Sequence, residues 1–275
     1  MKVWLDDRLV DEAQARVHVS DHGLTVGDGV FETLKVVGGV PFALRRHLDR
    51  LETSAAALGL PVDRDLVLRA VRAVLAADQA GADDRARLRV TLTGGPGPYG
   101  SDRGATAPTL VVTASPLGQW PAAADVVTVP WVRNERSATA GAKTTSYAEN
   151  VVALAYAKAR GGGEAIFANT VGNLCEGTGS NVVVALDGRL VTPPLSSGCL
   201  AGVTRALVVE WLGVEEVDVP LSALGDADEA FLTSTTRDVQ PIATVDGQRL
   251  ASAPGPLTAK AIEVFATRAA ADADP

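Results

Sequence analysis

The distribution of apolar residues along the chain predicts a series of short strands. Apolar runs are separated by turn signals such as Asp6-Asp7 and Gly38-Gly39, and residues 2–5 and 8–10 are expected to pair as a hairpin. Strands are expected over 2–5, 8–10, 29–44, 87–93, 108–114 and 125–132, and further strands follow with Asp-Gly turns at 187–188 and 246–247.

A second pattern, with apolar residues every three or four positions, predicts helices. It is clearest over 63–77, where one helix face collects Leu66, Ala70, Val71, Val74 and Leu75. Other helices are expected over His47–Leu58, about 145–160, 203–212 and 257–269. The tail after the last helix, ADADP, is expected to be frayed.

The order of these elements indicates an α+β fold, because strands and helices are mixed without a regular βαβ alternation. A length of 275 residues allows two domains. Residues 117–124 have the composition of a linker. We therefore expect an N-terminal α/β domain over 1–116 and a C-terminal domain over 125–275.

Composition narrows the function classes. The chain is 47% apolar and 21% charged, with a net charge of -8, so it lacks the basic surface that nucleic acid or an anionic membrane requires. No apolar run approaches the roughly 18 residues of a membrane span. The first residues, MKVWLDDRLV, are unlike a signal peptide, and Cys175 and Cys199 fit a reducing compartment. We expect a cytoplasmic protein that acts on a small molecule and, since its three histidines lack ligand spacing, holds no metal.

Lys143 is the first candidate for chemistry. It is one of two lysines between residues 36 and 259, and small residues surround it in AGAKTTSYAEN. A lysine that loses solvation becomes an amine nucleophile because its pKa falls. Taken alone, however, the pattern favours a lysine in a surface loop.

Three places can bind a phosphate group. Val203 and Thr204 begin the helix in SGCLAGVTRALVVEW, where free amides and the helix dipole favour an anion. TSTT at 233–236 offers hydroxyls at the end of a strand, and Arg50 lies in RRHLDRL. The alternatives are an ordinary helix start, a polar strand end and a solvated helix face.

Glu176 lies in NLCEGTGSN between an apolar pair and a glycine-rich turn. A carboxylate that faces inward there can hold a protonated ring nitrogen. A solvated glutamate in a hairpin explains the same pattern equally well.

Taken together, these motifs resemble the class IV aminotransferases, the fold-type IV enzymes that use pyridoxal 5'-phosphate (PLP). The resemblance extends from about Asp21 to Ile242. It rests on six blocks in the family's order: DHGLTVGDGVFETLKV, RRHLDRL, AGAKTTSYAENV, EAIFANTVGNLCEGTGSNVVV, TPPLSSGCLAGVTRALVVEW and FLTSTTRDVQPI.

The resemblance implies a role for each matching residue. Lys143 matches the lysine that carries the cofactor, and Glu176 matches the partner of the ring nitrogen. The other cofactor contacts implied are the phosphate ligands Arg50, Val203, Thr204 and Thr235, the ring neighbour Leu200 and the ring-hydroxyl partner Tyr147. Phe31, Thr33 and Thr236 match substrate-binding positions. The family also implies a homodimer and a larger, barrel-like C-terminal domain, with PLP between the two domains.

Within the family, the sequence is most similar to 4-amino-4-deoxychorismate lyases, which eliminate pyruvate to leave 4-aminobenzoate for folate synthesis. DHGLTVGDGVFET, with Thr33, and TPPLSSGCLAGVTR favour this activity. Branched-chain and D-amino-acid aminotransferases are the alternatives. The first tend to carry FEG where this chain has FET. The second usually place an arginine and a histidine in the loop that here reads TGGPGPYGSDRG, and this chain lacks that pair at the expected position, although Arg103 lies further along the loop. An inactive PLP-binding scaffold is a remote alternative.

Overall fold

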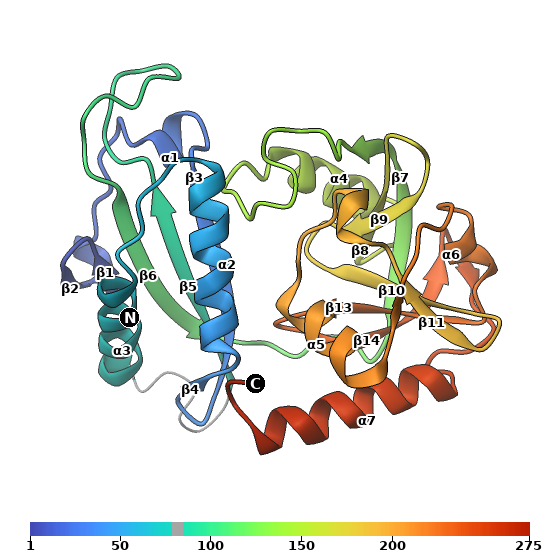
Figure 1. The fold of residues 1–275 in the computed structure, drawn as a ribbon. Helices are drawn as coiled ribbons and strands as arrows, with labels where there is room; N and C mark the ends of the chain where they lie inside the picture. The colour runs from blue at the N-terminus through green and yellow to red at the C-terminus, as the bar shows by residue number, and fades with distance from the viewer. Residues whose placement is uncertain (79–84) are drawn as a thin grey trace. The chain divides into compact units, whose positions relative to one another are not determined.

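The computed structural model describes residues 1–78 and 85–275, which form two compact units (Figure 1). The first comprises Met1–Gly118, Ala142–Tyr147 and Ala273–Pro275, and the second comprises Gln119–Gly141 and Ala148–Asp272. Two short segments from far along the sequence, one of them carrying Lys143, are thus grouped with the first unit. The domain ranges expected from sequence stay a prediction.

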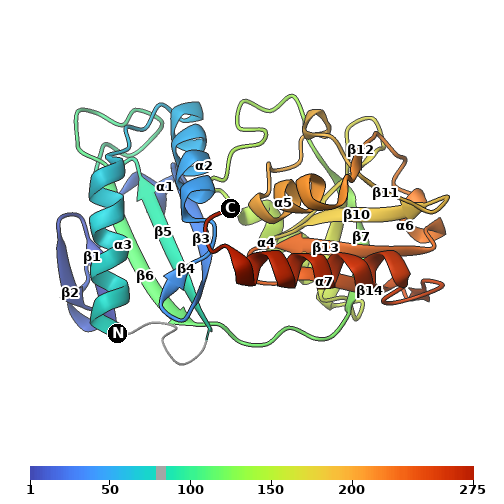
Figure 2. The ribbon, with the colours of Figure 1, turned by 60° about the horizontal axis from the view of Figure 1, so that its bottom comes forward.

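The first unit is an antiparallel six-stranded sheet with helices on one face (Figure 2). Its strand order is β2 (Arg8–Asp11), β1 (Lys2–Leu5), β6 (Thr109–Pro116), β5 (Arg85–Thr93), β3 (Gly29–Val37) and β4 (Val40–Pro41). The helices α2 (Leu44–Ala57) and α3 (Arg64–Asp78) cover this face, and the short elements η1 (Glu12–Gln14) and α1 (His22–Thr25) precede β3.

Alternation along β3 separates the two faces of this sheet. Val30, Leu34 and Val36 are buried in the core that also receives apolar residues of α2 and α3. Phe31 and Thr33 point the other way, because successive strand residues face opposite sides. Thr33 pairs directly with Arg89 of β5, so these two side chains share the face that the helices leave uncovered.

The second unit is built on a curled nine-stranded sheet (Figure 1). Its strand order is β12 (Glu215–Glu216), β11 (Arg189–Thr192), β10 (Asn181–Leu186), β13 (Glu229–Ser234), β14 (Asp238–Val245), β7 (Ala124–Arg133), β8 (Glu164–Asn169) and β9 (Leu174–Gly177), with β15 (Gln248–Arg249) beside β14. The helical elements are α4 (Ala148–Lys158), η2 (Leu195–Ser197), α5 (Val203–Leu212), α6 (Ala223–Asp226) and α7 (Pro256–Ala271).

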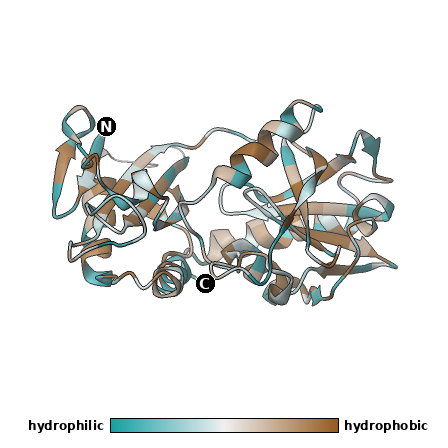
Figure 3. Ribbon diagram, turned by 90° about the horizontal axis from the view of Figure 1, so that it is seen from above, coloured by the Kyte–Doolittle hydropathy of each residue, from teal (hydrophilic) through white to brown (hydrophobic). Residues whose placement is uncertain are grey.

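Apolar strands supply most of the core of the second unit, and Figure 3 shows them as largely hydrophobic ribbons. Val182, Val184, Leu232 and Ile242 belong to one cluster. A smaller cluster seats α4 on β7 and β8. These contacts fix the strand ends from which the polar residues of the next section project.

The structure confirms the α+β fold and most of the predicted elements. The predicted helix over 203–212 coincides with α5, and that over 63–77 differs from α3 by one residue at each end. No helix within the described ranges is long and apolar enough to span a bilayer.

The chain's C-terminal tail differs from its predicted frayed state. The carbonyl of Ala273 accepts the amide N–H of Ala43 at 2.7 Å, and Asp274 accepts the N–H of Arg45 at 2.9 Å. The tail therefore satisfies donors at the start of α2. This helix begins at Leu44, three residues before the predicted start, inside the stretch expected to be strand.

Candidate functional site

Backbone hydrogen bonds attach the Lys143 segment to β3. The carbonyl of Lys143 accepts the Phe31 amide at 3.0 Å, and the Thr145 amide donates to Gly29 at 2.8 Å. A Cβ on Gly29 would lie 2.9 Å from the Leu92 carbonyl and 3.0 Å from Thr145 Oγ1, so a larger residue would push the segment away. Gly29, in the block DHGLTVGDGVFETLKV, thus positions Lys143.

The half-buried amine of Lys143 lies among aromatic rings. Nζ donates to the hydroxyl of Tyr147 at 3.4 Å and lies 4.5 Å from the ring centroid of Phe31. The two rings pack edge to face with centroids 5.1 Å apart. This apolar wall orients the amine and removes part of its hydration.

Arg50, in α2, belongs to a buried network of side chains that joins this helix to β3. Its Nε and Nη2 each donate to the carboxylate of Glu32 at 2.7 Å, and His47 Nδ1 lies 2.6 Å from the same carboxylate. Burial opposes the charge on Glu32, but Arg50 and His47 outweigh it and hold the pKa of Glu32 at about 2. Burial lowers the pKa of His47, and Arg50 and Lys143 add to this effect against the opposing charge of Glu32.

This network predicts an acid-sensitive fold. The contribution of Glu32 to the free energy of unfolding is complete above about pH 4.5 and is lost as the pH falls toward 2, because its folded pKa is depressed. The contribution of His47 to the free energy of unfolding is lost as the pH falls below about 6.5. The reason is that the pKa of His47 is lowered in the folded protein, so the unfolded chain takes up a proton first. We expect Glu32→Gln to cost about 3 kcal/mol near neutral pH and to flatten the dependence between pH 5 and 3.

Chemical denaturation at pH 7, 5 and 3 measures these changes. Glu52→Gln is the control, since Glu52 is a half-exposed carboxylate of α2, the helix that carries Arg50 and His47, and it should keep the wild-type slope. A Glu32→Gln variant with that slope would contradict the assignment.

Arg89 is a second cation at the Phe31 ring, and the sequence patterns did not single it out. Its guanidinium carbon lies 3.4 Å from the ring centroid, and Nε donates to Thr91 at 3.1 Å. Burial lowers its pKa, although an arginine stays charged. Within residues 1–78 and 85–275, no carboxylate forms an ion pair with Arg89. The site thus holds a charged guanidinium suited to a ligand carboxylate.

Arg103, by contrast, is bound within the loop between β5 and β6. Its Nε and Nη2 donate to Asp28 at 2.5 and 2.6 Å, and its pKa is raised mainly by this hydrogen bonding. His22 Nε2 lies 2.9 Å from the carbonyl of Pro98 in the same loop. Arg103 therefore ties the loop to the segment before β3.

In the second unit, Glu176 lies in β9, one residue before its end, and both of its carboxylate oxygens accept hydrogen bonds. Arg133 Nε donates to Oε1 at 3.1 Å, and the Leu200 amide donates to Oε2 at 2.9 Å. Arg133 also bonds Glu149 at 2.7 Å and stacks on Phe167 at 4.0 Å. These donors hold the Glu176 carboxylate in a fixed orientation.

Leu200 connects Glu176 to the first turn of α5. Its carbonyl accepts Asn181 Nδ2 at 2.9 Å, and a Cβ on Gly202 would lie 2.0 Å from Asn181 Oδ1, so a larger residue would displace the Asn181 side chain. Gly202 is the N-cap and provides no side-chain cap to the buried Val203 and Thr204. The helix start can thus receive an anion.

Thr235 and Thr236 lie in the turn that follows β13, which the Arg237 amide closes by donating to Ser234 at 3.2 Å. The Ser234 hydroxyl is buried and has no hydrogen-bond partner among the described residues. The same is true of Ser180, in the turn after Glu176. Buried hydroxyls of this kind need a partner, which a bound ligand can supply.

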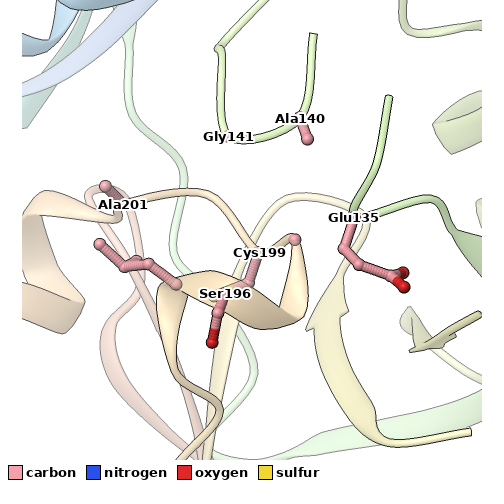
Figure 4. Close-up of a pocket in the computed structure, with 8 residues that line it drawn as sticks. Glu135, Ala140, Gly141, Ser196, Cys199 and Ala201 are labelled. Atoms are coloured by element: carbon pink, nitrogen blue, oxygen red, sulfur yellow. The ribbon is translucent and has the colours of Figure 1, made fainter. Parts of the chain in front are cut away.

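A cavity of about 300 Å³ lies in the second unit, with Cys199 and Ala201 in its lining (Figure 4). Its lining comprises Glu135, Ala140, Gly141, Leu195, Ser196, Gly198, Cys199 and Ala201. Burial raises the pKa of the Cys199 thiol, which keeps it protonated. No group of His, Cys, Asp and Glu side chains in the described ranges is arranged to hold a metal ion.

The eleven residues singled out in the sequence thus fall into two groups, one in each unit. The first contains Phe31, Thr33, Arg50, Lys143 and Tyr147, and the second contains Glu176, Leu200, Val203, Thr204, Thr235 and Thr236. Arg89 and Arg133 were missed. The signal that could have found Arg89 is a charged residue opposite Thr33 in the predicted sheet, but that needs the strand register.

Comparison with known proteins places the chain in one family. Residues 29–245 match class IV aminotransferases. A D-alanine aminotransferase of Bacillus licheniformis is 31% identical over 271 residues, which cover 94% of this chain and 93% of the relative. A bifunctional aminodeoxychorismate lyase / D-amino acid transaminase of Mycobacterium tuberculosis is 32% identical, covering 92% and 94%.

Solved structures agree with this assignment. A branched-chain aminotransferase of Thermoproteus uzoniensis, solved with norvaline, has 32% identity and a TM-score of 0.86, covering 97% of this chain and 93% of that one. A protein of Mycobacterium tuberculosis described as a hypothetical aminotransferase, solved in its PLP-bound form, has 29% identity and a TM-score of 0.87, covering all of both chains. The protein therefore belongs to the class IV aminotransferases, a family of PLP-dependent enzymes.

Proposed function

We propose that the protein is an amino-acid aminotransferase that moves an amino group from an amino acid to a 2-oxo acid. The observation that carries this proposal is the charged guanidinium of Arg89, which lies on the same Phe31 ring as the amine of Lys143. Both substrates of this reaction carry a carboxylate, and Arg89 is suited to bind it. This order of preference reverses the one expected from sequence, which favoured the lyase.

The donors and acceptors in the chain fit PLP. Lys143 offers an amine, and Glu176 is a carboxylate that its two donors hold in place. The uncapped start of α5 is suited to a phosphate group, and so is the Ser234 hydroxyl, which has no hydrogen-bond partner among the described residues. We therefore assign PLP contacts to Lys143, Tyr147, Glu176 and Leu200, and phosphate contacts to Arg50, Val203, Thr204 and Thr235.

In the proposed reaction, Lys143 moves a proton and other residues of the first unit hold the substrate. When bound, PLP supplies an electron sink for the charge that develops beside the substrate nitrogen. Lys143 Nζ takes the proton from the substrate carbon that bears the amino group, and the Tyr147 hydroxyl orients Nζ. Arg89 holds the substrate carboxylate, with Phe31, Thr33 and Thr236 at the substrate.

The test of this function compares substrates on the PLP-loaded enzyme. L- and D-amino acids are supplied with 2-oxoglutarate, and aminodeoxychorismate is supplied in parallel. We expect amino-acid turnover to exceed 4-aminobenzoate formation. Release of 4-aminobenzoate at the higher rate would contradict the proposal.

Arg89→Met is expected to raise KM for the amino acid and the oxo acid about 10- to 100-fold, because a charge-assisted hydrogen bond to the carboxylate is lost. The absorbance of bound PLP should remain. Arg87→Met is the matched control, since Arg87 is exposed two residues earlier on the same strand. Equal KM values for the two variants would contradict a substrate contact by Arg89.

The lyase is the second candidate. One relative carries both activities in its name, and the chain shares the blocks that suggested a lyase. Thr33, a hydroxylated residue directly opposite Arg89, favours a polar substrate over an aliphatic one. The aminodeoxychorismate arm of the experiment above tests this candidate.

We further propose, from family resemblance, a homodimer in the cytoplasm. Light scattering on the purified protein should give twice the mass of the 28.3 kDa chain. The proposed domains remain 1–116 and 125–275, joined by 117–124.

A further inference from the structure

A buried ion pair in the second unit joins Glu164, at the start of β8, to Arg237, after β13. Arg237 Nη2 donates to Glu164 Oε2, and the exposed fractions of the two side chains are 7% and 1%. Burying two charges removes both from water at a large cost, so a well-packed apolar pair is often as stable. Stability alone therefore does not account for this pair.

The other oxygen of Glu164 organises the turn after Glu176. Oε1 accepts the hydroxyl of Thr178 and, at 3.1 Å, the amide of Gly179. A Cβ on Gly177 would lie 3.1 Å from this oxygen and 2.4 Å from Ser180 Oγ, so the turn packs closely on the carboxylate. Glu164 thus fixes the end of the strand that carries Glu176.

Arg237 organises the turn that contains Thr235 and Thr236. Its amide closes that turn on Ser234 at 3.2 Å. Its guanidinium lies 4.0 Å from the Trp120 ring and donates to Gln240 Oε1 at 3.2 Å. These contacts leave the Arg237 side chain little freedom.

We propose that Glu164 and Arg237 form a positioning pair that sets the distance between the two turns that bind PLP. One turn follows the ring-nitrogen partner Glu176, and the other contains the phosphate ligand Thr235. Each turn also carries a buried hydroxyl, Ser180 or Ser234, that lacks a partner within the described residues. The inference rests on the proposed roles of Glu176 and Thr235 in PLP binding.

PLP affinity of the apoenzyme tests the pair apart from activity. The double variant Glu164→Gln/Arg237→Met removes both charges, so no buried charge is left unpaired. We expect its Kd for PLP to rise about tenfold or more, because small displacements of positioned groups are costly. Since the pair sets the phosphate turn, the preference for PLP over pyridoxal, which lacks the phosphate, should also fall.

Two further variants separate positioning from general destabilisation. Glu229→Gln alters another buried carboxylate of the unit, which accepts the amides of Leu257 and Thr258 at the start of α7. It should keep the wild-type preference for PLP over pyridoxal. Arg237→Lys keeps the positive charge and should recover part of the PLP affinity, and it serves as the test if the double variant does not fold.

The outcomes are distinct. If the wild-type apoenzyme does not bind PLP, the proposed function and this inference both fail. If the wild type binds PLP and the pair variants keep the wild-type preference for PLP over pyridoxal, only the inference is overturned. The control Glu229→Gln is expected to keep that preference in either case. A fall in that preference confined to the pair variants supports it.

Discussion

Replacement of Lys143 by alanine is expected to reduce transamination by at least about 10³-fold, the largest effect of any single change in the chain. The variant loses both the amine that holds PLP covalently and the base that moves the substrate proton. It should still fold, because the attachments of its segment to β3 are backbone bonds to Phe31 and Gly29. Single-turnover kinetics and borohydride reduction measure the two losses separately.

Lys158→Ala is the matched control. Lys158 is the other lysine between residues 36 and 259 and is exposed at the end of α4. It should keep wild-type activity, and its reduced holoenzyme should retain bound cofactor. If Lys143→Ala keeps the yellow, borohydride-sensitive band, another amine carries PLP and the assignment is wrong.

The sequence was sufficient for elements whose pattern is local. The helices at 64–78 and 203–212 follow from apolar spacing, and the hairpin turn at Asp187-Gly188 follows from its residue types. The start of α2 was not predictable in this way. Its donors are satisfied by Ala273 and Asp274, more than 200 residues away, and no local pattern reports such a contact.

The candidate site shows the same division. Lys143, Glu176 and Arg50 could be chosen because blocks of sequence around them resemble a family. The partners Glu32 and Arg133 could not, since a charged residue within a strand pattern has a partner only once the strands and helices are placed. Arg89 is the clearest case, because its importance comes from its position at the ring of Phe31.

Most substitutions of Glu176 would remove hydrogen bonds that its carboxylate accepts. Its two oxygens accept from Arg133 and from the Leu200 amide, so an amide side chain would place a donor group against one of these donors. Arg133 would lose one of its two carboxylate partners and keep Glu149. A change at Glu176 therefore alters charge and local hydrogen bonding while the ion pair with α4 remains.

Glu176→Gln is expected to lower kcat/KM about 10²- to 10³-fold, because a neutral amide no longer stabilises a protonated ring nitrogen and the electron sink is weakened. Lys143 should still bind PLP. Glu149→Gln is the matched control, since it removes the other carboxylate that binds Arg133. The Glu149 side chain is 52% exposed, so this change should alter kcat/KM less than about threefold. Equal losses in both variants would show that Glu176 acts only by holding Arg133. A loss confined to Glu176→Gln assigns the effect to the carboxylate itself, and pre-steady-state measurement of proton abstraction should then locate it in the step that Lys143 performs.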